Sequence, residues 1–174
     1  ILRADGPTLY NSMVVLDPVG QITATYDKHH LVPFGEYMPL RPVLSALGLH
    51  VFADMFGDGF GEGEGAQTLD FGALGKGLPL ICYEAVFAHD VGAAKDRPDF
   101  LIQLTNDAWF CTFAGPKQHL AQAKMRAIEQ GLPMARAANT GISAMIDPYG
   151  RVLNSLALNE AGFVDELLPK PLPP

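Results

Sequence analysis

Two short apolar runs in the middle of the chain constrain the possible folds more than any other feature. LPLICY occupies residues 78–83 and FLIQLT occupies residues 100–105, and turn or polar residues bound each run. Short runs of this kind are typical of strands that are buried on both faces, as in a parallel sheet. We therefore expect both segments to lie at the centre of a sheet.

The clearest helical pattern is PKQHLAQAKMRAIEQG, at residues 116–131. Pro116 suits the first helical position, and Gly131 suits the C-terminal stop. A shorter helix is expected just after Cys82, before the next apolar run. Strands then alternate with helices, which predicts an α/β domain whose helices cover a mixed sheet. The apolar positions that share one face of the long helix are Leu120, Ala123, Ala127 and Ile128.

Two pairs of segments have the pattern of β-hairpins. MVVL at residues 13–16 and ITATY at 22–26 are separated by the turn DPVGQ. ISAMID at 142–147 and RVL at 151–153 are separated by the turn PYG. Apolar runs joined by such short turn sequences are typical of antiparallel strand pairs. We expect both hairpins at the margins of the mixed sheet.

Composition excludes some functions. The chain has 174 residues and a formal net charge of −7, and it has no basic run. Binding to nucleic acid through its phosphates requires such a run, so nucleic acid is excluded as a partner. The longest stretch without a charged residue spans twelve residues, 42–53, whereas crossing a bilayer takes about 20 apolar residues. No segment of this chain is expected to span a membrane.

Cys82 stands where an apolar strand is expected to end and a helix to begin. A thiol at that place points from the carboxyl end of the sheet and lies near a helix N-terminus, which favours a thiolate. Glu84, two residues on, orients a partner or supplies a negative charge to the first helical turn. The alternative is a buried cysteine at the end of a strand, with no chemical role.

A dense polar and aromatic segment, YDKHHLVPFGEYMP, occupies residues 26–39. Lys28 follows a predicted strand, where its ammonium can favour a thiolate and stabilise an oxyanion. Glu36 can hydrogen-bond that lysine or a substrate. The alternatives are an ordinary surface lysine and a solvated acid. His29 and His30 have no ligand partner at a suitable spacing, and we interpret them as loop or packing residues.

The segment LTNDAWF, at residues 104–110, follows the second apolar run. Asn106 suits an Asx turn or a helix cap, and Trp109 is a candidate for the wall of a pocket. A capped turn with aromatic packing is the alternative.

No pattern in the sequence predicts a metal or another cofactor. The two cysteines, Cys82 and Cys111, form no CxxC motif and no Cys/His spacing. DMFGDGFGEGE at residues 54–64 is rich in acids and glycine, but its acids do not have the spacing of a calcium-binding EF-hand. We interpret this segment as a flexible solvated loop or a lid.

Three segments, taken in order, resemble the carbon-nitrogen hydrolase (nitrilase) superfamily, and more specifically its bacterial apolipoprotein N-acyltransferase family. YDKHHLVPFGEYMP is similar to the lysine motif of that family, and LICYEAVF is similar to its nucleophile motif. NDAWF and GPKQHLAQAKMRAIEQGLPMARAANTGISAMIDPYGRV are similar to its downstream half. The likeness covers nearly the whole chain, and all the motifs occur in register.

The resemblance implies a nitrilase-like αββα sandwich of the α/β class, incomplete at its N-terminal side, and a catalytic set of Glu, Lys and Cys. Carried over by position, Cys82 is the nucleophile and Lys28 is the catalytic lysine. Glu36 and Glu84 are the supporting carboxylates, and Tyr83 flanks the nucleophile. The general-base glutamate of the family is expected upstream of this chain, by some tens of residues before the lysine motif.

The reaction that the resemblance implies is an acyl transfer in two steps. The Cys82 thiolate takes a fatty acyl chain from a phospholipid as a thioester. The amino group of a diacylglyceryl-cysteine at the N-terminus of an apolipoprotein then attacks it. A base removes the thiol proton, and Lys28 stabilises the developing oxyanion. Without the general base and the membrane helices, the isolated chain is expected to be inactive.

The same resemblance implies a place on the periplasmic face of the bacterial inner membrane, between transmembrane helices of a longer protein. Residues 1–168 are then a partial carbon-nitrogen hydrolase domain, and the Pro-rich tail at 169–174 leads toward a transmembrane segment. The slight apolar excess of the composition fits such a location. The side chains expected to face lipid are those of Phe34, Met38, Leu40 or Phe56.

One position departs from the family pattern, and two other functions stay open. Cys111 stands where glycine usually follows NDAWF, and it either crowds the pocket or is a tolerated loop thiol. A soluble amidase of the same superfamily uses water as the acyl acceptor, although the FGEY and NDAWF versions of the motifs favour the acyltransferase. The third hypothesis is a non-catalytic fragment that binds partners. In that case, Cys82→Ser in the full-length protein should leave its cellular role intact.

Overall fold

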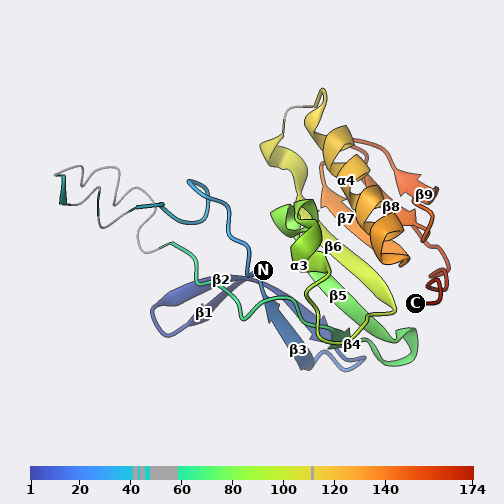
Figure 1. Ribbon diagram of the computed structural model, residues 1–174, viewed down its shortest axis with the longest axis horizontal. Helices are drawn as coiled ribbons and strands as arrows, with labels where there is room; N and C mark the ends of the chain where they lie inside the picture. The colour runs from blue at the N-terminus through green and yellow to red at the C-terminus, as the bar shows by residue number, and fades with distance from the viewer. Residues whose placement is uncertain (41–42, 44–45, 48–58, 111) are drawn as a thin grey trace. The chain divides into compact units, whose positions relative to one another are not determined.

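The computed structural model describes residues 1–40, 43, 46–47, 59–110 and 112–174. Contacts between residues divide the chain into two compact units, Ile1–Gly65 and Ala66–Pro174. The first unit contains a three-stranded antiparallel sheet in the order β1-β2-β3 (Figure 1). Its strands are β1 (Leu2–Asp5), β2 (Thr8–Leu16) and β3 (Ile22–Asp27).

The predicted hairpin of residues 13–16 and 22–26 is confirmed in this unit, because β2 and β3 pair with Met13 opposite Tyr26. Its predicted place at the margin of the central sheet is wrong. β2 is paired with β1 along one edge and with β3 along the other, so the hairpin forms the larger part of a separate sheet. The side chains of Met13 and Tyr26 are buried.

The second unit contains a six-stranded mixed sheet in the order β4-β5-β6-β7-β8-β9. The two apolar runs are neighbouring parallel strands, β5 and β6, as the sequence predicts, and β7 continues the parallel part. The predicted hairpin near the C-terminus is confirmed as β8 and β9. The strands are β4 (Leu69–Asp70), β5 (Lys76–Ile81), β6 (Phe100–Asn106), β7 (Met134–Asn139), β8 (Ser143–Ile146) and β9 (Val152–Leu156).

The long helix α4 (Gly115–Gln130) confirms the prediction for residues 116–131 within one residue at each end. Pro116 lies in its first turn, and Gly131 ends it in the left-handed conformation, with φ 62°. The prediction that Ile128 shares the buried face is wrong, because that side chain is 54% exposed. Ile128 follows Ala127 and is therefore turned about 100° around the helix axis from it.

The helix predicted just after Cys82 is shorter and tighter than expected. The segment forms the 3-10 helix η2 (Cys82–Val86), and a single α-helical turn, α3 (Ala88–Val91), follows. A left-handed residue at the first position does not fit a regular α-helix, which explains the difference. The other short helices are η1 (Gly72–Leu74) and η3 (Asp107–Trp109).

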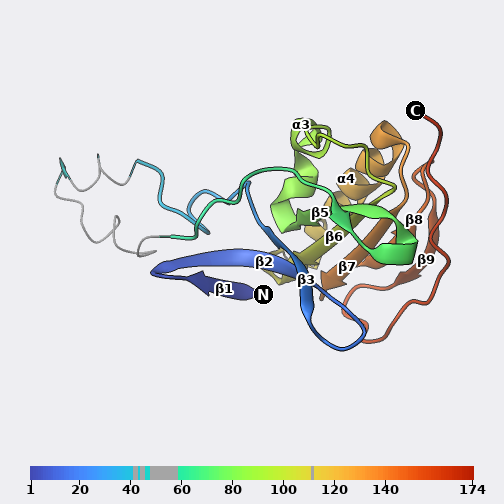
Figure 2. The ribbon, with the colours of Figure 1, turned by 90° about the horizontal axis from the view of Figure 1, so that it is seen from below.

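Helices α3 and α4 cover one face of the six-stranded sheet (Figures 1 and 2). Ala123 and Ala127 of α4 are fully buried, and their small side chains let the helix approach the strands closely. None of the helices in the described part of the chain combines the length and apolar character that crossing a bilayer requires. The apolar core of this layer consists of Leu78, Leu80, Ala85, Val91, Leu101, Ala123, Ala127, Leu132, Met134, Ala144 and Ile146.

Candidate active site

Cys82 directly follows β5, at the carboxyl end of a parallel strand. Its backbone is left-handed, with φ 52°, whereas Ile81 before it is extended. Few residues other than glycine adopt a positive φ, and residues that do so cluster at functional sites. The half-buried thiol therefore stands at a sharp junction between a strand and a helical turn. The predicted position of Cys82 at the end of a strand is confirmed.

Glu84 is fully buried in the same turn. Its Oε2 atom accepts a hydrogen bond of 2.7 Å from the backbone N–H of Ile81. Because Ile81 and Glu84 lie on either side of Cys82 in the chain, this bond closes the turn around the cysteine. Tyr83 packs edge to face against Phe87, with 4.8 Å between the ring centroids. Glu84 thus supports the backbone of the turn.

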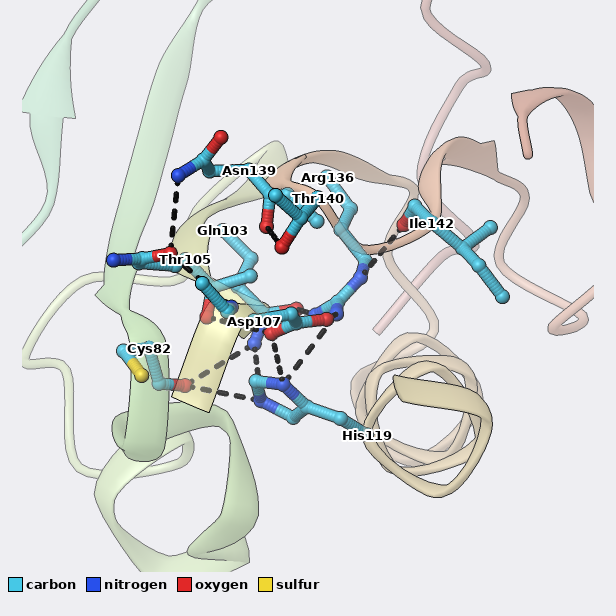
Figure 3. Close-up of polar contacts among 12 residues, drawn as sticks. Cys82, Gln103, Thr105, Asp107, His119, Arg136, Asn139, Thr140 and Ile142 are labelled. Atoms are coloured by element: carbon cyan, nitrogen blue, oxygen red, sulfur yellow. Dashed lines mark hydrogen bonds and ion pairs between the residues drawn. The ribbon is translucent and has the colours of Figure 1, made fainter. Parts of the chain in front are cut away.

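A buried polar network holds the carbonyl group of Cys82 (Figure 3). The carbonyl oxygen accepts a hydrogen bond from Gln103 Nε2 at 3.2 Å and lies 3.2 Å from His119 Nε2. Gln103 belongs to β6 and His119 to α4, and both side chains are buried. Figure 3 shows the imidazole facing the carbonyl oxygen of Cys82 rather than its sulfur atom. The network therefore acts on the backbone of the cysteine.

Asp107 anchors the other end of this network. Its Oδ1 atom accepts a hydrogen bond of 3.0 Å from the Thr105 hydroxyl and lies 2.9 Å from His119 Nδ1. Its Oδ2 atom accepts a hydrogen bond of 2.7 Å from a guanidinium nitrogen of Arg136. The other terminal nitrogen of Arg136 donates to Gln103 Oε1 at 2.5 Å. The buried side chains of the network are Gln103, Thr105, Asp107, His119 and Arg136.

The charges in the network support one another. Burial raises the pKa of the Asp107 carboxyl, but the hydrogen bond with His119 and the charge of Arg136 outweigh it, so this pKa lies below its ordinary value. The pKa of Arg136 lies below its ordinary value, because burial lowers it more than the charges of Asp107 and Cys82 raise it. An arginine keeps its charge in proteins. Asp107 and Arg136 thus form a buried ion pair.

Lys28, the predicted catalytic lysine, lies in the first unit. Lys28 directly follows β3, is 1% exposed, and its Nζ atom donates to Glu36 Oε2 at 2.6 Å. A buried ammonium needs such a partner, because an unpaired buried charge costs several kcal/mol. Glu36 also accepts hydrogen bonds from the Val32 N–H at 2.8 Å and from Asn11 Nδ2 at 3.1 Å. The structure thus brings two of the predicted site residues together.

Backbone contacts fix the end of β3 that carries Lys28. The Lys28 N–H donates to the Asn11 carbonyl at 2.8 Å, and the Gly63 N–H donates to the Lys28 carbonyl at 2.9 Å. A Cβ atom at Gly63 would lie 2.0 Å from the Asp27 carbonyl oxygen, so only glycine fits there. Part of the acidic, glycine-rich segment therefore packs against the lysine, whereas its residues 54–58 lie outside the described residues.

The two predicted pocket residues have different environments. Asn106 Oδ1 accepts hydrogen bonds from the Ala108 N–H at 3.2 Å and from Asn139 Nδ2 at 3.1 Å. Asn106 is therefore the N-cap of η3. The side chain of Trp109 is 83% exposed. Asn106 thus forms the predicted cap, and a place for Trp109 in the wall of a pocket stays a prediction.

The side chains predicted to face lipid are described in part. Phe34 is 65% exposed and Leu40 is 71% exposed, whereas Met38 is half-buried. Phe56 and Cys111 lie outside the described residues.

His29, interpreted as a packing residue, lies with its Nδ1 atom 2.8 Å from the Tyr26 hydroxyl. In the described ranges, no group of three or more His, Cys, Asp or Glu side chains could hold a metal ion.

Sequence reasoning missed the network behind Cys82. Gln103 is the polar residue within the apolar run FLIQLT, and His119 lies one turn before Ala123 on the buried face of α4. Arg136 lies opposite Gln103 in the pairing of β6 and β7. These polar residues stand at positions that the sequence pattern predicts to be buried. Buried polar groups must find partners inside the protein, so their positions could have indicated the network.

Comparison with known proteins identifies the family. Residues 1–166 match the family described as Carbon-nitrogen hydrolase. The chain belongs to the carbon-nitrogen hydrolase family. The predicted α/β fold of the nitrilase type is confirmed by this match and by solved structures. An amidase from Nesterenkonia sp. superposes with a TM-score of 0.63 at 23% identity, over 91% of this chain and 55% of the amidase chain.

Curated members of this carbon-nitrogen hydrolase family are more similar in sequence. The apolipoprotein N-acyltransferase of Bradyrhizobium diazoefficiens (strain JCM 10833 / BCRC 13528 / IAM 13628 / NBRC 14792 / USDA 110) is 48% identical over 165 residues, 95% of this chain. The apolipoprotein N-acyltransferase of Brucella melitensis biotype 1 is 48% identical over 173 residues, 98% of this chain. The chain spans 30% of the length of the first relative and 32% of the second.

Proposed function

We propose that the chain is part of an apolipoprotein N-acyltransferase. The enzyme transfers a fatty acyl chain from a phospholipid to the N-terminal amino group of a diacylglyceryl-cysteine apolipoprotein. The curated relatives, at 48% identity over 95% or more of the chain, support this assignment. The observation that carries the mechanism is the left-handed Cys82 at the end of β5.

Cys82 is the nucleophile in this proposal. Its thiolate attacks the ester carbonyl of the phospholipid, and the C–O bond to glycerol breaks. A thioester on Cys82 and a lysophospholipid result. The amine of the apolipoprotein then attacks the thioester, the C–S bond breaks, and an amide and a free thiol result. Splitting the transfer into two steps with a covalent intermediate is how nucleophilic catalysis lowers the barrier.

Lys28 supplies the positive charge in the proposed mechanism. Its contact with Glu36, at 2.6 Å, holds the ammonium in one place within a buried setting. A fixed cation can stabilise the oxyanion that develops at the attacked carbonyl, without reorganisation during the step. We assign Glu36 to the support of Lys28 and Glu84 to the support of the Cys82 turn. Removal of the thiol proton is assigned to a glutamate of the full-length protein, as the resemblance implies.

The proposed setting is the periplasmic face of the inner membrane, where phospholipid and apolipoprotein both reach the enzyme. Phe34, within the lysine segment, and Leu40, directly after it, expose large apolar side chains. Exposed apolar side chains of this kind favour contact with lipid. Residues 169–174, which include four prolines, are proposed to lead toward a membrane segment of the longer protein.

The test uses the full-length protein in detergent with a phospholipid that carries a labelled palmitoyl chain. Mass spectrometry of the Cys82 peptide should show a labelled thioester, and Cys82→Ser should show none. Cys111→Ser, which removes the other thiol of this chain, is the matched control and should keep the label. A diacylglyceryl-cysteine peptide added afterwards should remove the label from Cys82 and become N-acylated.

Two outcomes would contradict this function. Release of the label as free fatty acid, at the same rate with and without the peptide, would indicate water as the acceptor and favour the amidase. Absence of any label on Cys82, together with normal cellular function of Cys82→Ser, would indicate a binding role without catalysis.

A further inference from the structure

The strongest feature outside the proposed catalytic residues is the buried network that contacts the Cys82 carbonyl. The orientation of the Gln103 amide in this network follows from its partners. Arg136 has donors only, so the Gln103 atom that it contacts is the amide oxygen. The Gln103 amide nitrogen therefore faces both the Cys82 carbonyl oxygen at 3.2 Å and His119 Nε2 at 3.1 Å.

His119 is held at both ring nitrogens. Its Nδ1 atom lies 2.9 Å from Asp107 Oδ1, and its Nε2 atom lies 3.2 Å from the Cys82 carbonyl oxygen and 3.1 Å from the Gln103 amide nitrogen. Asp107 therefore fixes the orientation of the imidazole ring, and Arg136 fixes the orientation of the Gln103 amide.

These contacts fix the backbone of the nucleophile. The peptide group is planar, so a donor that fixes the Cys82 carbonyl fixes the whole plane between Cys82 and Tyr83. On the other side of Cys82, Glu84 fixes the N–H of Ile81 at 2.7 Å. Two buried side chains therefore hold the chain on both sides of a residue whose backbone is left-handed, with φ 52°. Strain of this kind persists only where the surroundings over-determine it.

We propose that Gln103 and His119 are positioning residues for the nucleophile, and that Asp107 and Arg136 hold these two in the required orientation. The network keeps Cys82 in its left-handed turn and so sets the direction of the thiol. This inference rests on the proposed function of Cys82. Because a displacement of about 1 Å at a reacting group can lower a rate about a hundredfold, loss of the network should slow acylation strongly.

The test compares variants of the full-length protein by their rate of Cys82 acylation from the labelled phospholipid. Gln103→Leu removes the donor to the Cys82 carbonyl, and His119→Leu removes the support of Gln103. We expect both to lower the maximal rate of acylation roughly tenfold to a hundredfold, with an unchanged KM for the phospholipid. His119→Asn keeps an N–H donor toward Asp107 and should restore part of the rate that His119→Leu loses.

Asp147→Asn is the control for a loss of stability without a change at the nucleophile. Asp147 is a buried carboxylate that accepts hydrogen bonds from the Tyr149 N–H and the Arg151 guanidinium, in the turn between β8 and β9. This variant should unfold at a lower temperature and acylate at the normal rate. A second readout needs no substrate: alkylation of Cys82 by iodoacetamide, followed by mass spectrometry of its peptide, should also slow in Gln103→Leu.

The outcomes separate this inference from the function on which it rests. If Cys82→Ser abolishes the thioester but folded Gln103→Leu and His119→Leu acylate at the normal rate, the positioning role is wrong. If they acylate slowly but His119→Asn recovers nothing and Asp147→Asn is equally slow, the effect is one of general stability and the inference also fails. If Cys82→Ser still transfers acyl chains, the proposed function itself fails.

Discussion

At the scale of single residues, the left-handed conformation of Cys82 has an energetic cost that the surrounding hydrogen bonds offset. A residue with a Cβ atom is strained at φ 52°, whereas glycine is not. The cost for other residues is of the order of 1 kcal/mol. The thiol is therefore kept at a position where glycine would be more stable, which indicates a role for the side chain itself.

This strain predicts a difference between two variants that both lack the thiol. Cys82→Gly should be more stable than Cys82→Ala by about 1 kcal/mol, because only glycine relieves the strained backbone. Denaturant unfolding of the two purified variants measures the difference, and both remove the same sulfur atom. Equal stability, or a more stable alanine variant, would show that Cys82 does not occupy the left-handed region in solution.

At the scale of elements, the strand ends bring the site residues into place. The parallel register puts Gln103 of β6 opposite Arg136 of β7, and α4 brings His119 over the same strands. The sequence predicts the strands, the long helix and the place of Cys82, because those depend on local patterns. It does not predict the network, because Gln103 and Arg136 are 33 positions apart and meet only through strand register.

The same limit applies to the first unit. The pairing of Lys28 with Glu36 could be anticipated, since the two residues are eight positions apart in one constrained segment. The contact of Gly63 with the end of β3 could not, because it joins segments 35 positions apart, residues 28 and 63. The glycine-rich composition of that segment indicated a flexible loop, whereas the tight approach of two backbones also requires glycine.

Gly63 therefore gives a prediction for the element that carries Lys28. Gly63→Ala places a Cβ atom 2.0 Å from the Asp27 carbonyl oxygen, so the segment must move away from β3 and lose its hydrogen bond to Lys28. We expect a loss of stability of roughly 1–3 kcal/mol, as for other overpacked sites. Gly92→Ala is the control, because Gly92 has φ −82° and a Cβ atom there meets no atom closer than 3.5 Å. Hydrogen exchange at the backbone amide of residue 63 should be faster in Gly63→Ala than in the unchanged protein.

At the scale of the whole molecule, the acidic composition and the buried carboxylates bear on stability in different ways. The net charge of −7 disfavours compaction only weakly, through repulsion between exposed groups that salt screens. Asp107 and Asp147 are buried and hydrogen-bonded, so their ionised forms are stabilised by folding. In both carboxyls, burial alone raises the pKa, but the hydrogen bonds and nearby cations outweigh it and lower the pKa.

A lowered carboxyl pKa in the folded state means that the unfolded chain binds protons more readily. The stability due to Asp107 and Asp147 is therefore fully present above the ordinary carboxyl pKa of about 3.9, and it is lost as the pH falls through the lowered values. We expect the free energy of unfolding to fall steeply in this acidic range. Asp107→Asn and Asp147→Asn should each be less stable at pH 7 and show a shallower fall, and the double variant should show the shallowest. Denaturant unfolding between pH 7 and pH 3 measures these slopes, and identical slopes in all four proteins would contradict the prediction.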